Sequence, residues 1–276
     1  MRGPEVILMR QQRTLRHAIG CAGVGLHSGA RVALTLRPAA EGSGIRFRRV
    51  DRPGTPVIPA RVSNLVVTDG VLGLEHHSGA RVQMVEHLLA ALWVCEIDNL
   101  LIDVSATELP VMDGSARSFV LLIECAGTVE QEEMVPRFEL LRPVCVESAV
   151  GYARIEPHRR LDLVVGAPGR PLAITASPER CRTELIDAPT GPVMGTAWRP
   201  DMANEVLRAL GTLALVPARV EARYVASGAD AALRAQLIRR LLADRDNWRL
   251  TGGAPQAGAW LHAAPLSAVT HLAHAS

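Results

Sequence analysis

Two adjacent side chains in the first half of the chain, Glu86 and His87, are of types that can do chemistry together. A carboxylate can accept a proton as a general base, and an imidazole can bind a metal ion. Both residues also have simpler interpretations. A histidine in a helix near the surface needs no function, and an acid in the first turn of a helix is favoured by the helix dipole. The pair alone therefore leaves a catalytic and a structural role open.

The other histidine groups indicate a site less strongly. His76 and His77 precede a Ser-Gly pair, and we expect them in a solvated loop. His262, His271 and His274 have spacings that invite a metal interpretation. Spacing alone is weak support, so we expect these three residues to belong to a flexible C-terminal tail.

The pattern around Glu86 and His87 predicts a helix between two strands. Apolar residues recur at helical spacing from Val85 to Leu92, whereas they alternate in the flanking segments. A second helix is expected after Asp113 or Ser115, either of which can cap its N-terminus. The elements expected in the first half are strands at 31–37, 44–48 and 99–104 and helices at 83–95 and 115–126.

The second half repeats this order in outline, without a close sequence repeat. The acidic, polar segment from Thr128 to Arg137 contains Pro136 and is interpreted as a link between two domains, residues 1–130 and 131–276. The elements expected beyond it are strands at 138–146, 152–157, 161–165 and 219–225 and helices at 204–216 and 230–243.

Composition excludes several classes of protein. Hydrophobic residues make up 48% and charged residues 21%, which is a globular balance, and a net charge of +2 gives no basis for nucleic-acid or membrane-surface binding. The five cysteines include no C-x-x-C pair, so neither a disulfide framework nor a zinc ribbon is expected. No apolar run reaches the roughly 20 residues of a membrane span. These features predict a cytoplasmic protein.

Several segments of the first half, in matching order and separation, resemble the zinc-dependent UDP-3-O-acyl-N-acetylglucosamine deacetylases, which commit bacteria to lipid A synthesis. They are Gln12 to Leu15, Gly23 to Gly29 (GVGLHSG), Val85 to Leu92 (VEHLLAAL), Ile97 to Asn99 and Pro110 to Ala116 (PVMDGSA). Residues 204–242 are similar more loosely. The resemblance implies an α+β fold of two domains, each a sheet packed with two helices, facing each other across a central cleft.

The resemblance also implies metal-assisted amide hydrolysis. A zinc ion held by three protein ligands lowers the pKa of a bound water, and a carboxylate takes the proton. One ligand then falls at His87 and the base at Glu86, while Thr183 matches a threonine that stabilises the oxyanion. His27 lies in one of the matching segments and is expected to face the cleft and the substrate.

The second-domain helix departs from the family at the metal site. The family's other two ligands are a histidine and an aspartate eight residues apart on one helix face, and the matching positions here are Asn204 and Thr212, with Arg208 between them. Neither is a strong zinc ligand, and a cation beside the metal position opposes a divalent ion. We therefore expect His87 to be the sole retained ligand and no cofactor to be bound.

Further departures concern the acid and the substrate. Ala229 stands where the family's general acid, a histidine, follows a Ser-Gly pair, and Glu205 reverses the charge of a family lysine. The stretch between Thr183 and Asn204 is shorter than in the family, which argues against an acyl-chain passage.

The leading expectation is a catalytically silent homologue whose cleft binds a nucleotide sugar or a protein partner of lipid A metabolism. Arg208 could pair there with a carboxylate or phosphate. One alternative is an active deacetylase or amidohydrolase on a UDP-amino sugar, with a rebuilt site and zinc if the site is metal-dependent. Another is a structural or interaction protein with a vestigial cleft. Metal content and a nucleotide-sugar titration would separate these alternatives.

Overall fold

The computed structural model describes residues 9–252 apart from residues 53, 55–56, 167–170, 187–199 and 217, and for residues 200 and 201 it describes the backbone only. Over these residues the chain has a mixed α+β fold, as predicted. No helix among them is long and apolar enough to cross a membrane. His262, His271 and His274 and most of the short stretch before Asn204 lie outside the described residues.

The first half forms a five-stranded mixed sheet, in the order β2-β3-β9-β4-β5, and a three-stranded antiparallel sheet, β6-β7-β8. Apolar residues alternate along β3, so Val32, Leu34 and Leu36 point into the core. The elements are β2 (Ile19–Val24), β3 (Arg31–Pro38), β4 (Ile45–Arg49), β5 (Ile58–Pro59), η1 (Val62–Asn64), β6 (Leu65–Thr68), β7 (Val71–Glu75), β8 (Arg81–Gln83), α1 (Glu86–Val94), β9 (Leu100–Val104) and α2 (Arg117–Ala126).

The second half forms a seven-stranded sheet around β16, whose partners are β11, β13 and β14. Strand β16 is long and has apolar side chains on its buried face, as a central strand requires. The elements are β11 (Arg137–Leu140), β12 (Val144–Glu147), β13 (Tyr152–Pro157), β14 (Asp162–Val165), β15 (Leu172–Thr175), α3 (Pro178–Glu184), α4 (Pro200–Leu213), β16 (Arg219–Ser227), α5 (Ala231–Ala243), η2 (Arg245–Asn247) and β17 (Trp248–Thr251).

The segment interpreted as an interdomain link is a strand over most of its length. β10 (Thr128–Met134) pairs antiparallel with β1 (Gln11–Leu15) in a two-stranded ribbon. None of the residues of β10 is fully buried, which explains its polar composition and the lack of a strand-like alternation in the sequence. The ribbon leads from α2 to β11, so it does connect the two halves.

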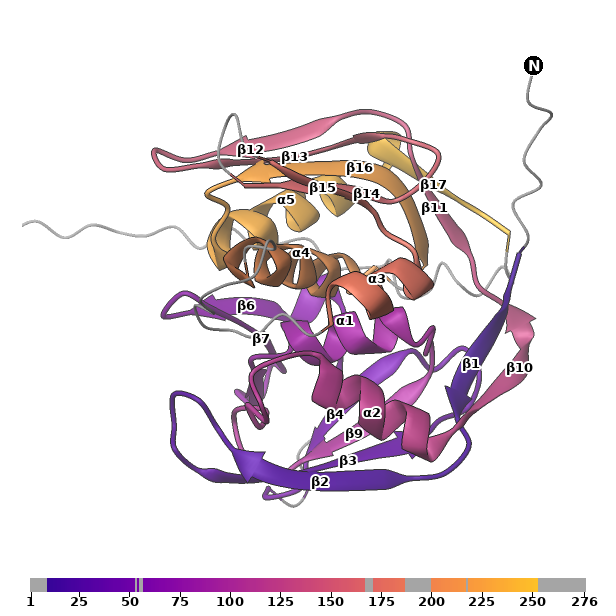
Figure 1. The fold of residues 1–276 in the computed structure, drawn as a ribbon, viewed down its shortest axis with the longest axis vertical. Coiled ribbons are helices and arrows are strands. Elements are labelled where there is room, and N and C mark those ends of the chain that lie inside the picture. Colours follow the sequence, from indigo (N-terminus) through magenta and orange to yellow (C-terminus); the bar gives the residue numbers. More distant parts are fainter. Residues whose placement is uncertain are drawn as a thin grey trace, which may run out of the picture.

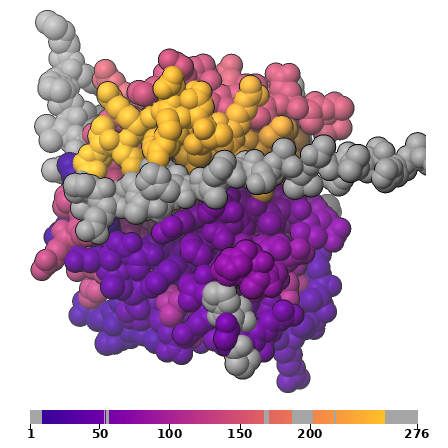
Figure 2. Space-filling model, turned by 180° about the vertical axis from the view of Figure 1, so that it is seen from behind, coloured from indigo at the N-terminus to yellow at the C-terminus, as the bar shows by residue number. Residues whose placement is uncertain are grey.

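The two halves stack with the five-stranded and the seven-stranded sheets outside and the helices between them, and β6 and β7 lie in the middle next to the helices of the second half (Figure 1). From behind, the early residues occupy the lower part of the molecule and the late residues the upper part (Figure 2). The helices meet where α1 packs on α4. Gly211 makes this approach possible, because a Cβ atom there would lie 2.1 Å from the carbonyl oxygen of Glu86.

Helix α1 is apolar on almost every side and is correspondingly buried, as expected for a helix enclosed between layers. Leu88 and Leu89 are each at most 1% exposed, and burial of each contributes on the order of 2 kcal/mol. The helix begins three residues later than predicted. Met84 has a φ of 62°, and this left-handed conformation cannot continue into a right-handed helix.

Candidate functional site

Glu86 and His87 open α1 and point into the contact of that helix with the second half. Both are buried, at 7% exposure each, and so is Asn204 of α4. The positive φ of Met84 turns the chain from β8 into the helix and fixes the direction in which these two side chains leave it. The three side chains that the resemblance places at the cleft are thus buried where α1 contacts α4.

Glu86 forms a buried ion pair that the sequence did not predict. Nη2 of Arg234, on α5, donates a hydrogen bond to Oε1 of Glu86 at 2.7 Å, and Nη1 donates to the carbonyl oxygen of Ala229 at 2.7 Å. Nε of Arg234 is buried without a hydrogen-bond partner among the described residues. The negative charge of Glu86 is thus neutralised by a cation from the other half of the chain.

A signal for this pair does exist in the sequence. Arg234 precedes Leu237, Ile238 and Leu241 at spacings of three, four and seven, which places it on the apolar stripe of α5. A cation on the buried stripe of a helix needs an anionic partner, because an unpaired buried charge is strongly unfavourable. Which anion serves could not be read from the sequence.

His87 is hydrogen-bonded to a position at which the resemblance would place a metal ligand. Its Nε2 lies 2.9 Å from Oδ1 of Asn204 and, when protonated, donates to that oxygen. Burial, and after it the charge of Arg208, lower the pKa of His87 to about 4, although the hydrogen bond with Asn204 opposes the shift. The ring is therefore neutral at physiological pH.

Arg208 and Thr212 follow Asn204 on the same face of α4. Arg208 is half-buried, and its side chain forms no hydrogen bond or ion pair with the described residues. The hydroxyl of Thr212 donates back to the carbonyl oxygen of Arg208 at 2.9 Å. This face therefore offers one cation and two neutral groups.

These residues do not fit a zinc ion. Asn204, Arg208 and Thr212 offer an amide, a guanidinium and a hydroxyl on the α4 face beside His87, and none of these groups is a usual zinc ligand. Glu86 is engaged by Arg234 and Thr212 by its own helix. Nowhere in the described part of the chain do three or more His, Cys, Asp or Glu side chains gather as a metal site would require.

Thr183 and His27 are not brought into contact with Glu86 or His87. Thr183 is exposed on α3, and its hydroxyl donates to the carbonyl oxygens of Glu179 and Arg180 in its own helix. His27 is exposed in the turn after β2. Both assignments remain predictions, and no contact in the structure supports them.

The turn that carries His27 is held by Glu108, a residue that the sequence did not single out. The backbone N–H groups of His27 and Ser28 and the hydroxyl of Ser28 donate to its carboxylate at 2.8–3.2 Å. Burial would raise the pKa of Glu108, but these donors outweigh it and lower the pKa. This arrangement accounts for the turn without a substrate.

Comparison with known proteins adds the family. The sequence model for LpxC, UDP-3-O-acyl N-acetylglycosamine deacetylase, matches residues 12–182, which is more than half of the 276 residues. The match includes Glu86 and His87, whereas Asn204, Arg208 and Arg234 lie beyond it.

Curated relatives with similar sequences bear the name UDP-3-O-acyl-N-acetylglucosamine deacetylase. The protein of Methylococcus capsulatus (strain Bath) is 50% identical over 151 residues, and that of Xanthomonas campestris pv. campestris (strain B100) is 44% identical over 150 residues. Each match covers 54% of this chain and 49% of the relative, so the chain spans about half the length of the curated relatives it matches. Because the family model matches residues 12–182, the chain belongs to the family of UDP-3-O-acyl N-acetylglycosamine deacetylases.

Proposed function

We propose that this chain is a non-catalytic member of its family, in which the position of the catalytic site has become a metal-free, packed contact between the two halves. The observation that carries this proposal is the buried pair of Glu86 and Arg234, at 2.7 Å. Oε1 of Glu86 already accepts a hydrogen bond from the guanidinium of Arg234, so this oxygen is not free to receive a proton from a water. At 7% exposure, Glu86 also has little access to a water or a substrate.

The contact of His87 with Asn204 supports the same proposal. A catalytic zinc site needs three protein ligands and an open fourth position. Here the ring nitrogen of His87 is occupied by the Asn204 side chain, and the half-buried cation of Arg208 lies near enough to lower the pKa of His87. A divalent cation at this place would meet repulsion from Arg208 and would find one nitrogen ligand.

The role of such a protein would be binding rather than hydrolysis. The relatives are named for a UDP-linked acylated sugar. We propose a nucleotide sugar or a protein partner of lipid A metabolism as the ligand class, with Arg208 as the cation available to a phosphate or carboxylate. We also propose that the chain divides into two domains, residues 1–130 and residues 131–276.

The test combines metal content with activity. Purified protein should contain far less than one zinc per chain by elemental analysis. It should not release acetate from UDP-3-O-acyl-N-acetylglucosamine under conditions in which the Methylococcus capsulatus relative is assayed in parallel. Turnover that disappears in Glu86→Gln, or stoichiometric zinc that disappears in His87→Gln, would refute the proposal.

Restoring the ligands tests the placement of the site. Asn204→His with Arg208→Asp and Thr212→Asp puts a histidine and two carboxylates on the α4 face opposite His87. The variant should melt at a lower temperature than the wild type without zinc, because the new carboxylates repel, and should gain thermal stability when zinc is added. A folded variant whose melting temperature zinc does not change would show that the site is misplaced.

A further inference from the structure

A pocket of about 700 Å³ lies toward the opposite end of α1 from Glu86 and His87. Its apolar floor includes Leu89, Leu92 and Trp93, all from the middle and end of that helix. None of Glu86, His87, Asn204 or Arg234 lines it. A volume of this size suits a ligand of roughly drug size, which gains most of its affinity from an apolar floor and its orientation from a few polar groups.

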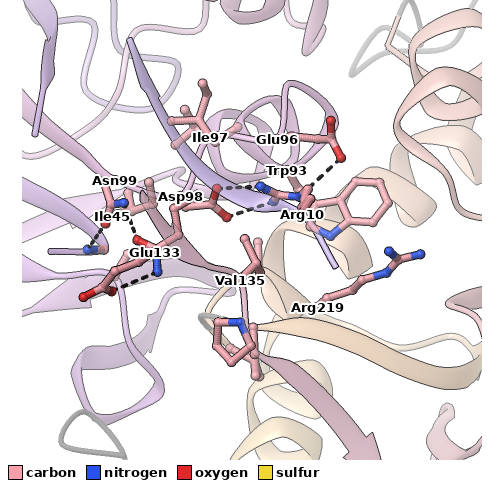
Figure 3. Close-up of a pocket in the computed structure, with 18 of the residues that line it drawn as sticks. Arg10, Ile45, Trp93, Glu96, Ile97, Asp98, Asn99, Glu133, Val135 and Arg219 are labelled. Atoms are coloured by element: carbon pink, nitrogen blue, oxygen red, sulfur yellow. Dashed lines mark hydrogen bonds and ion pairs between the residues drawn. The ribbon is translucent and has the colours of Figure 1, made fainter. Parts of the chain in front are cut away.

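The carboxylates that line the pocket already accept hydrogen bonds from the protein. Asp98 accepts two from the guanidinium of Arg10, at 2.7 and 2.8 Å, and Glu96 also pairs with Arg10 (Figure 3). Glu96 pairs with Arg13 as well. Glu41 accepts from two backbone N–H groups of β10, and Glu133 accepts from the side-chain amide of Gln12 at 3.4 Å. These acids are therefore not free to attract a cationic ligand at full strength.

Two arginines that line the same pocket lack such partners. The side chains of Arg61, which is half-buried, and Arg219, which is exposed, form no hydrogen bond or ion pair within the described part of the chain. In Figure 3 the side chain of Arg219 ends without a dashed line, in contrast to Arg10. Burial, and then the charge of Arg46, lower the pKa of Arg61, which is the sign expected where no anion lies close by.

Trp93 gives the pocket that both arginines line a flat apolar surface. Its side chain is half-buried, whereas every other residue of α1 is buried. A partly exposed indole can stack on a ring of a ligand, and a guanidinium can bind a phosphate or carboxylate with two parallel hydrogen bonds. One cavity therefore contains a surface for a ligand's ring and cations for its anionic group.

We propose that this pocket binds an organic anion that carries an apolar or aromatic group, with Arg61 and Arg219 on the anion and Trp93 and the leucines of α1 on the apolar group. The site is separate from the proposed metal-free contact at Glu86 and does not depend on it. A phosphate monoester and a carboxylate both supply the anionic group that the arginines would bind. The aromatic group of the ligand distinguishes either of them from a free inorganic anion.

The probe is naphthyl phosphate, titrated into the full-length protein by calorimetry at low ionic strength. The expected Kd is about 1 mM or below, and inorganic phosphate and neutral naphthol should each bind at least about tenfold more weakly. Arg61→Gln and Arg219→Gln should weaken binding, by about tenfold in at least one of them, since each removes a charge-assisted hydrogen-bond partner.

Arg223→Gln is the matched control, because Arg223 is an exposed arginine on the same strand as Arg219 and does not line the pocket. It should leave the affinity unchanged, and melting curves should confirm that all variants are folded. The proposal would be overturned if the wild type did not bind naphthyl phosphate, or if Arg223→Gln lost as much affinity as the pocket variants. Tighter binding of naphthylmethylamine than of naphthyl phosphate would also overturn it.

Discussion

Replacing Arg234 by methionine should destabilise the protein strongly. The substitution keeps most of the apolar stem but removes the guanidinium that lies 2.7 Å from Glu86. The side chains of Arg234 and Glu86 are 5% and 9% exposed, so water cannot replace the lost partner. Removing one member of a buried ion pair typically costs about 3–5 kcal/mol, because the remaining charge is buried without compensation.

A double variant separates the free-energy cost of the unpaired carboxylate from the cost of lost packing. In a double variant, Glu86→Leu with Arg234→Met, no buried charge remains, and apolar replacement of a buried pair is often close to neutral. We therefore expect the double variant to be more stable than Arg234→Met by about 2 kcal/mol or more. Recovery of this kind would identify the uncompensated carboxylate as the cause.

The assay is urea unfolding followed by circular dichroism, with the free energy of unfolding extrapolated to water. Arg180→Met serves as the control, because Arg180 pairs with Glu184 on an exposed helix face and its loss should change little. The reasoning fails if Arg234→Met loses less than about 1 kcal/mol, or if the double variant is as unstable as the single one.

Two further predictions concern neighbouring residues. The unfolded chain protonates His87 near the ordinary pKa of 6.5 and the folded chain only near pKa 4, so stability is lost as the pH falls. Measured by urea unfolding, this loss of stability should reach about 2 kcal/mol between about pH 7.5 and about pH 5. It should be absent in His87→Gln and smaller in Arg208→Gln. Gly211→Ala should lower stability by about 1–3 kcal/mol despite a better helix propensity, because the new Cβ would lie 2.1 Å from the Glu86 carbonyl oxygen. A variant as stable as the wild type would show that α1 and α4 can move apart freely.

Local patterns predicted the elements with strong periodicity. Helices α1, α2 and α5 and strands β3, β9 and β16 lie close to the expected ranges, because their apolar residues follow the helical or strand period. Several elements were not predicted, among them helix α3, the strands β6, β7 and β8, and strand β17. β17 pairs with β11, with Arg249 opposite Glu139, and a pairing between residues so far apart in the sequence leaves no local pattern.

The sequence by itself determined the α+β class, the segments shared with the family in the first half, and the presence of Asn204, Arg208 and Thr212 on one helix face. These properties depend on residue type and short-range spacing. The partners of Glu86 and His87 were decided only by the tertiary structure, because both partners come from helices more than 100 residues away. The same holds for the pocket, which is lined by residues of both halves of the chain, among them Arg61 and Arg219. Spacing limits which side chains share a helix face, whereas packing decides which charges find a partner.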